Sequence, residues 1–320
     1  EAERRQAKHD IQHVEDIVIE MLRNARDAGA DKVYLATTKE DGVRTLVFLD
    51  NGSGVPQDMQ ERIFDARVTS KLESMKMDRW GVHGRGMALF SIKQNTDEAR
   101  VVTSDVDLGS VFKVSVATDR LGERADQSSW PQAVKDEDGH YVCARGPHNI
   151  IRAACEFALE ELRACDVYLG SPSEIAATLH AQASSRLDAS RLLFIDDEAE
   201  LPVVDRLGLA SDADDFIRIC SGLGLEMSER TAHRILAGQI KPVRGVTARL
   251  LRERDSSSHA SAPVDLAKDR RGLRIAKDDM AQFSRAVERD FNDLASRYYL
   301  NLCGDPKIRV SRDRITVTFD

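Results

Sequence analysis

The sequence lacks the features that would assign it to a membrane, secreted or strongly basic class of protein. Its apolar runs all fall short of the roughly 18 residues that a membrane helix needs, and its first residues are charged, unlike a signal peptide. Five cysteines are scattered without metal or disulfide spacing, which is typical of reduced, buried thiols. The net charge of −8 gives no overall positive field, so nucleic-acid binding needs a local basic patch. We expect a cytoplasmic protein without a membrane segment.

The remaining composition is that of an ordinary globular protein. The chain has 320 residues, of which 42% are hydrophobic and 31% are charged, and this balance supports a buried core without specifying a partner. A chain of this length forms either two domains or one large one. Function therefore has to be sought in local motifs.

The first 121 residues alternate between helical and strand patterns. Apolar residues recur at helical spacing from Ile11 to Ala28, and Gly29 is a natural helix stop. A strand pair joined by an Asp41-Gly42 turn follows. The predicted elements after the first helix are strands at 33–37, 43–49, 99–104 and 110–117, and helices at 56–64 and 86–94. We predict an α/β class domain over residues 1–121, an α+β sandwich whose mixed, largely antiparallel sheet is covered by helices.

The rest of the chain has a different character. Residues 122–147 are polar and turn-rich, which predicts a linker or an irregular excursion. Residues 148–265 are predicted to be mainly helical, with helices at 150–163, 172–184, 212–223 and 228–237. Residues 266–320 are expected to form a long helix, 278–300, followed by a terminal β-hairpin.

Three polar side chains share one arc of the first predicted helix. At about 100° per residue, Glu20, Asn24 and Asp27 lie beside the apolar stripe of that helix. They form either a solvated face or a binding site, because a carboxylate can polarise water and an amide oxygen is a suitable Mg²⁺ ligand.

A carboxylate and two glycines follow the second predicted strand. Asp50 is either a turn residue or a buried acceptor for an exocyclic amine, which would discriminate adenine from guanine. Gly52 and Gly54 permit close approach of the backbone to a flat ring, although any loop uses glycine in this way.

A glycine-rich string, Gly81-Val82-His83-Gly84-Arg85-Gly86, precedes the apolar helical segment that begins at Met87. Glycines before a helix N-terminus expose amide donors to phosphate oxygens. The string follows a predicted loop rather than a strand and lacks a terminal Lys-Ser or Lys-Thr pair. These departures disfavour both a dinucleotide-binding fingerprint and a Walker loop.

Together and in this order, the three segments resemble the GHKL (Bergerat-fold) ATPase superfamily, which includes gyrase-type topoisomerases, a heat-shock chaperone, histidine kinases and MutL proteins. The resemblance covers about residues 10–118. It implies that the chain binds ATP with Mg²⁺, that Glu20 is the catalytic base, that Asn24 ligates the metal and that Asp50 contacts adenine. Ser110 stands where the family usually has threonine. The cofactor-binding residues that the resemblance implies are Asn24, Asp27, Asp50, Gly52, Gly54, Lys71, Gly81, Val82, His83, Gly84, Arg85, Gly86, Met87 and Ser110.

Further features distinguish the branches of the superfamily. Arg67-Val68-Thr69-Ser70-Lys71 is similar to the Thr-Ser-Lys segment of MutL-like members and of type IIB topoisomerase B subunits. Lys71 is either a charge near the phosphates or a solvated lysine. A two-component kinase is disfavoured because only His9 and His13 precede the first motif. The polar, aperiodic segment 65–79 is expected to form a nucleotide-responsive lid.

The second half contains two weaker motifs. Gln239-Ile240-Lys241-Pro242 is similar to the gyrase Gln-Thr-Lys loop, whose lysine senses the terminal phosphate, although its surroundings here are helical. Leu223-Gly224-Leu225 between two predicted helices suggests a helix-turn-helix. A local basic bias accompanies it, from Arg230, Arg234, Lys241, Arg244, Arg249, Arg252 and Arg254. This patch is either a phosphate-contacting surface or the solvated face of a helical bundle.

The sequence therefore predicts a protein that binds ATP and hydrolyses it with Mg²⁺, acting as a nucleotide-gated conformational switch. One alternative is a DNA-transaction subunit, a MutL- or topoisomerase-like clamp that dimerises on ATP. Another is a protein kinase or signalling ATPase. The predicted partners are ATP or ADP, a second copy of the chain in an ATP-dependent homodimer, and DNA or a protein that binds the C-terminal helical region.

Overall fold

The computed structural model describes most of the chain up to Leu251 and short segments beyond it. The described residues are 7, 9–66, 68, 76–78, 81–83, 87–162, 164–187, 195, 197–251, 283–288, 291, 307–310 and 315–318. Segments 76–78 and 81–83 are described by their backbone alone. The chain divides into two compact units, residues 1–256 and 257–320.

A five-stranded sheet forms the centre of the first unit, in the order β5-β6-β2-β1-β9. The strands are β1 (Lys32–Glu40), β2 (Val43–Asp50), β5 (Glu98–Ser104), β6 (Ser110–Ala117) and β9 (Asp166–Gly170). Among the described strands of this sheet, only β1 and β9 pair in parallel. The β1–β2 turn holds Asp41 and Gly42 at φ values of +48° and +78°, as an Asp-Gly hairpin requires. The predicted mixed, largely antiparallel sheet is confirmed.

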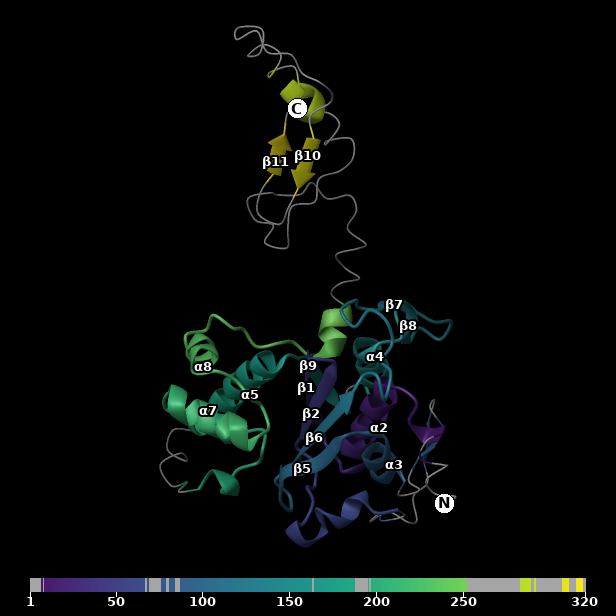
Figure 1. Cartoon of the computed structure of the whole chain (residues 1–320), viewed down its shortest axis with the longest axis vertical. Coiled ribbons are helices and arrows are strands. Elements are labelled where there is room, and N and C mark those ends of the chain that lie inside the picture. Colours follow the sequence, from purple (N-terminus) through teal and green to yellow (C-terminus); the bar gives the residue numbers. More distant parts are fainter. Residues whose placement is uncertain are drawn as a thin grey trace. The chain divides into compact units, whose positions relative to one another are not determined.

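Helices cover both faces of this sheet, so the first unit has three layers (Figure 1). One layer, which lies to the right of the sheet in Figure 1 and is called the front layer below, contains α2 (Val14–Asp27), α3 (Ala88–Asn95) and α4 (Ile150–Glu160). The back layer contains α5 (Pro172–Arg186), α7 (Ala213–Gly222) and α8 (Glu229–Leu236). The predicted helical cover is therefore present, and the mainly helical region of the second half supplies its back layer.

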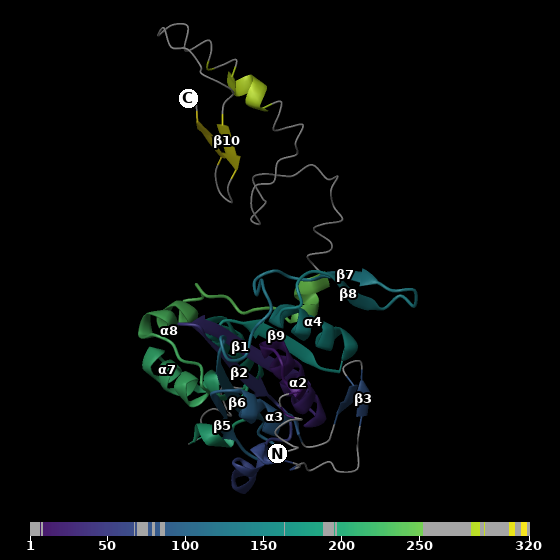
Figure 2. The same cartoon turned by 45° about the vertical axis from the view of Figure 1, so that its right-hand side comes forward.

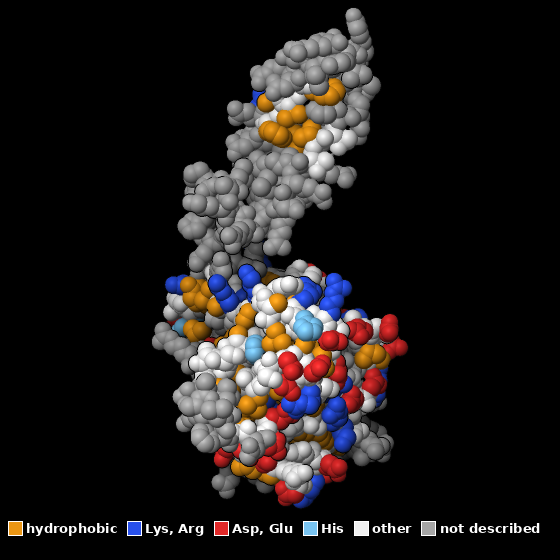
Figure 3. Space-filling view, turned by 90° about the vertical axis from the view of Figure 1, so that its left-hand side faces the viewer, with side chains coloured by type: hydrophobic (Ala, Val, Ile, Leu, Met, Phe, Trp, Pro, Cys, Tyr) orange, Lys and Arg blue, Asp and Glu red, His pale blue; other side chains and the backbone are white. Residues whose placement is uncertain are grey.

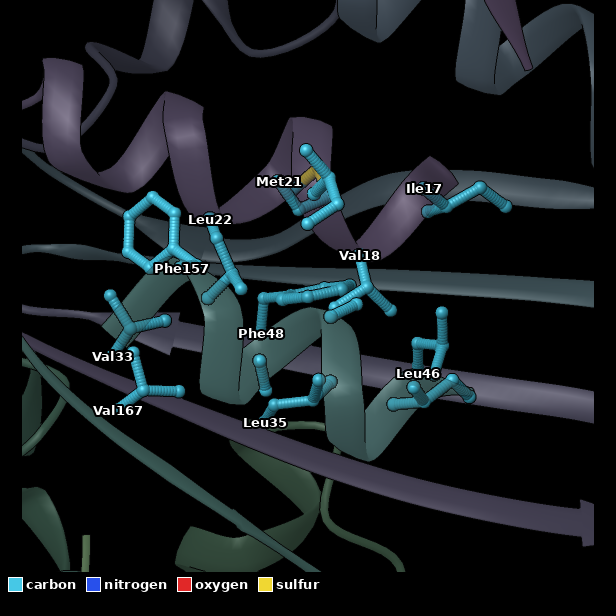
Figure 4. Close-up of a cluster of buried hydrophobic side chains, with 14 of the residues drawn as sticks. Ile17, Val18, Met21, Leu22, Val33, Leu35, Leu46, Phe48, Phe157 and Val167 are labelled. Atoms are coloured by element: carbon cyan, nitrogen blue, oxygen red, sulfur yellow. The ribbon is translucent and has the colours of Figure 1, made fainter. Parts of the chain in front are cut away.

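The side chains of each strand point alternately to the two faces of the sheet, which explains why helices cover both faces. In β1, Leu35 packs in the front core and Tyr34 in the back core. Neighbouring β2 residues alternate in the same way, with Phe48 in front and Val47 behind. A strand that is buried on both faces reads as a continuous apolar run. Figure 4 shows the front core, where side chains of α2 meet those of the sheet and Phe157 of α4.

The short elements between β2 and α3 differ from the prediction. The expected helix at 56–64 is two 3-10 turns, η1 (Gln57–Met59) and η2 (Arg62–Phe64). In these turns only Phe64 is buried, so the segment lacks the apolar stripe that stabilises an α-helix. The glycine-rich string begins as a strand: β4 (Gly81–His83) pairs with β3 (Lys76–Asp78).

The predicted linker at 122–147 contains a hairpin, β7 (Gln132–Lys135) and β8 (Tyr141–Arg145), which projects beside α4 in Figure 2. Arg152 of α4 fixes its base, because the guanidinium Nη2 donates to the Cys143 carbonyl at 2.9 Å. The structure differs here from the expected division after residue 121. Helix α4 and strand β9 belong to the same core as the first helix, and this compact unit continues to residue 256.

The remaining elements are short. Turns η3 (Glu198–Glu200) and η4 (Arg206–Leu209) precede α7. In the second unit β10 (Lys307–Val310) pairs antiparallel with β11 (Ile315–Thr318), which agrees with the predicted terminal hairpin, and residues 283–288 are helical. No helix within the described residues is long and apolar enough to cross a membrane.

Candidate functional site

A buried carboxylate lies at the end of β2 and is held by two hydrogen bonds. Register places Asp50 opposite Ser110 of β6, on the front face of the sheet. Asp50 is 4% exposed; the Ser110 hydroxyl donates to its Oδ2 at 2.6 Å and the Gly52 backbone N–H donates to Oδ1 at 2.8 Å. Burial raises the pKa of the Asp50 carboxyl, and these two hydrogen bonds oppose the rise. An ionised carboxylate has lone pairs left to accept a ligand amine.

Glycines let the loop after Asp50 pack against its neighbours. A Cβ on Gly52 would meet the carbonyl oxygen of Ala28 at 2.9 Å, and one on Gly54 would meet that of Asp105 at 1.8 Å. Gly54 also has a φ of +69°, which only glycine adopts without strain. The Ser53 N–H donates to the Ala28 carbonyl at 2.9 Å. This backbone contact joins the Asp50 loop to the C-terminal end of α2.

The three polar residues of α2 are half-buried on one arc of the helix, as the sequence indicates. Glu20 accepts a hydrogen bond from Arg23 Nη1 at 2.6 Å, and the Arg23 side chain is 3% exposed. Asp27 Oδ1 accepts from Arg26 Nε at 3.2 Å. The structure thus brings Asp27 near the Asp50 loop and holds the Glu20 carboxylate against a buried guanidinium.

Asn24 provides the test of whether this site suits an oxygen-binding metal. Its side-chain Nδ2 atom is buried and has no hydrogen-bond partner among the described residues. A buried NH₂ donor without a partner is unfavourable, and an acceptor atom of a bound ligand would satisfy it. The amide oxygen of Asn24 is a hard ligand of the kind that Mg²⁺ prefers, and the carboxylates of Glu20 and Asp27 lie on the same arc of α2. The residues present fit this metal.

The phosphate-binding half of the predicted site is described only in part. Gly81, Val82 and His83 form β4, and Met87 is the half-buried residue before α3, a helix that packs against α2. The N-terminus of α3 therefore lies on the same layer as Glu20 and Asn24. The predicted site residues Lys71, Gly84, Arg85 and Gly86 lie outside the described residues, as does most of the expected lid.

Sequence reasoning missed two residues that shape the site. Arg23 fixes Glu20, and its only signal in the sequence is the i, i+3 spacing from an acid on a helix. Ser104 at the end of β5 is buried; its hydroxyl donates to the Gly109 carbonyl at 2.8 Å and accepts from the Val55 N–H at 2.7 Å. Ser104 therefore ties together the two loops that flank Asp50.

Lys241 does not reach this site within one chain. Its neighbour Ile240 packs in the back core, and the Val243 N–H donates to Thr178 of α5 at 2.9 Å. The sheet separates this layer from Asn24 and Asp50. A phosphate-sensing role for Lys241 therefore does not fit the fold of the single chain, because the residues around it are helical and back-layer rather than a strand-rich domain beside the nucleotide.

Comparison with known proteins gives a family match over the part of the chain that contains these residues. Residues 11–127 match the family model described as "Histidine kinase-, DNA gyrase B-, and HSP90-like ATPase". The DNA mismatch repair protein MutL of Thermodesulfovibrio yellowstonii is 32% identical over 104 residues, which are 31% of this chain and 19% of that protein. MutL of Pediococcus pentosaceus is 30% identical over 121 residues, 37% of this chain and 18% of the relative. The chain thus spans less than a fifth of the length of the curated relatives that it matches.

Proposed function

Residues 11–127 form a domain of the GHKL family, the histidine kinase-, DNA gyrase B- and HSP90-like ATPases, and we propose that this domain binds ATP between α2, the Asp50 loop and the start of α3. The observation that carries the proposal is the buried Asp50 carboxylate, held by Ser110 and Gly52 directly beside the C-terminal end of α2. A buried acceptor beside glycine backbone is suited to an adenine ring and its exocyclic amine.

Each side chain has a distinct proposed role. Asp50 accepts from the adenine amine, Ser110 holds Asp50 in place, and Gly52 and Gly54 let the backbone approach the ring. Asp27 lines the same end of α2. The segment from Gly81 to Met87, which includes Val82, His83 and Arg85, binds the phosphates together with Lys71.

Hydrolysis is the finer part of the proposal. Glu20 orients or deprotonates the attacking water as a general base. Arg23 holds the Glu20 carboxylate in one position at 2.6 Å. This contact limits the motion of Glu20. Asn24 would hold Mg²⁺, which when bound supplies charge neutralisation on the phosphates.

We further propose that ATP acts on this chain as a conformational switch, and that it does so by promoting a homodimer. The similarity to MutL proteins supports this reading over a kinase. The test is calorimetric titration of the full chain with ATP, GTP and adenosine, together with its mass in solution with and without a non-hydrolysable ATP analogue. We expect ATP to bind and GTP not to bind, and the mass to double. Equal binding of GTP would contradict the adenine assignment, whereas ATP binding at constant mass would contradict the dimer alone.

A further inference from the structure

The back layer contains a helix pair that ATP binding does not use. Helix α7 is followed by a tight turn, in which Gly224 has a φ of +69°, and then by α8, which starts at the cap residue Ser228. Leu225 N–H donates to the Cys220 carbonyl at 2.8 Å and closes the end of α7. The predicted helix-turn-helix arrangement is therefore present, and its second helix lies at the surface.

Helix α8 buries one side and exposes the other. Ala232 and Ile235 pack in the back core, with Phe216 and Ile219 of α7. The residues on the opposite, exposed face lie on an arc of roughly 160° at 100° per residue. These exposed residues are Glu229, Arg230, His233, Arg234, Leu236 and Ala237. A helix anchored in this way presents a rigid and mostly polar face, with Leu236 and Ala237 as its apolar members.

That face and the segment after it are basic. Residues 228–251 contain five Lys and Arg residues and a single acid, in a chain with a net charge of −8. Arg230, Arg234, Lys241 and Arg244 are exposed, and none of them forms an ion pair with another described residue. In Figure 3, which shows the side of the molecule that carries α7 and α8, Lys and Arg side chains gather along the upper border of the compact unit.

Several arginines elsewhere in the described residues are paired with carboxylates at short distance, for example Arg44 with Glu123 at 2.9 Å and Arg186 with Asp205. The four basic residues of this face and of the segment after it have no such partner among the described residues. A row of unpaired, exposed positive charges is what a polyanion needs, because phosphates replace released counterions at each of them. An α-helix is about 10–12 Å in diameter and fits the major groove of duplex DNA, which is about 12 Å wide.

We propose that the exposed face of α8, with Lys241 and Arg244, is a docking surface for duplex DNA. Arg230 and Arg234 lie one helical turn apart and contact phosphates or guanine edges. Glu229 and His233 flank them and meet the groove. Lys241 and Arg244 follow the helix and contact the backbone. The back-layer position of this surface makes it independent of the nucleotide site and of whether ATP is hydrolysed.

The test measures anisotropy of a labelled duplex of about 30 base pairs with the full chain, without nucleotide, over a series of NaCl concentrations. The wild type should bind with a steep salt dependence. Arg230→Ala/Arg234→Ala should weaken binding about tenfold and reduce the slope of log K against log salt by about 2, since two phosphate contacts are lost. The matched control is Arg62→Ala/Arg145→Ala, which removes two exposed arginines from η2 and β8 and should leave affinity within about twofold.

Three results would overturn the proposal: no binding of duplex by the wild type at low salt, equal weakening by both double variants, or tighter binding of single-stranded RNA of the same length.

A second measurement uses the unmodified chain, so it does not depend on the folding of any variant. Amide hydrogen exchange across 228–244 should slow when duplex is added. Unchanged exchange there, with DNA bound, would place the contact elsewhere.

Discussion

Asp50→Asn is the sharpest perturbation of the adenine site because it removes a charge and nearly preserves the volume of the side chain. In the wild type both carboxylate oxygens accept, one from Ser110 at 2.6 Å and one from Gly52 at 2.8 Å. An asparagine has one acceptor oxygen and an NH₂ donor. The variant therefore removes the negative charge and replaces one carboxylate oxygen with a donor, where the adenine amine needs an acceptor.

The expected loss of affinity follows from that mismatch. Leaving a buried polar group without its partner costs about 1–3 kcal/mol, which corresponds to a roughly 5- to 150-fold increase in the Kd for ATP. Calorimetric titration measures this change directly. A folded Asp50→Asn chain that binds ATP as tightly as the wild type would refute the assignment of Asp50 to adenine.

The pH dependence of stability provides an independent check on the same residue. Burial raises the folded-state pKa of Asp50 above its ordinary value of 3.8. The stabilising contribution of the Asp50 side chain is therefore complete when the pH lies below that ordinary value. The contribution is then lost as the pH rises through the raised pKa. The Tm of Asp50→Asn relative to the wild type should therefore fall as the solution is acidified.

Asp97→Asn is the matched control. Asp97 is exposed, and hydrogen bonds from the Ala117 N–H and Arg120 lower the pKa of its carboxyl. Its contribution is present above the ordinary pKa and is lost on acidification, so the trend in relative Tm should have the opposite sign. ATP affinity should be unchanged in this variant. Parallel trends in the two variants would contradict the reasoning for Asp50.

Three further predictions concern the same domain. Glu20→Gln should retain ATP binding and lose about 10²–10⁴-fold in turnover if Glu20 is the base; unchanged phosphate release would contradict this. Segment 65–79 should exchange amide hydrogens rapidly without nucleotide and be protected by a non-hydrolysable ATP analogue but not by adenosine; equal exchange in all three states would exclude a lid. Gly54→Ala should destabilise the chain far more than Gly42→Ala, because both glycines have positive φ but only at Gly54 would the Cβ meet backbone, at 1.8 Å; equal losses of Tm would show that the Asp50 loop can rearrange.

Local signals made much of the fold predictable. The Asp41-Gly42 turn and the strand patterns on either side of it predict the β1–β2 pair, which the structure contains. The helical spacing from Ile11 predicts α2, which the structure also contains. The register of β2 and β6 then places Ser110 opposite Asp50, although their roles toward a nucleotide remain predictions. These features depend on contacts that are near in sequence or on regular strand pairing.

The parts that were missed depend on long-range contacts. Strand β9 has five residues and pairs with β1 across more than a hundred positions, so no turn signal marks it. Burial on both faces of the sheet explains the apolar run Leu46-Val47-Phe48-Leu49. This burial becomes evident only once the back layer of helices is known. The Glu20–Arg23 contact is one of many charged pairs that a helix sequence permits, and burial of the guanidinium, which gives it importance, is set by tertiary packing.

Strand β9 and helix α4 have a practical consequence for any shortened form of the protein. The family match ends at residue 127, but Phe157 and Val167 fill the front core beneath α2 (Figure 4). A fragment that stops at the match would leave the hydrogen-bonding edge of β1 open and one side of Leu22 and Val33 in water. Such an edge is a template for pairing with other chains. The fragment would therefore precipitate as an aggregate, and the smallest piece that can be purified as a folded nucleotide-binding domain extends beyond Gly170.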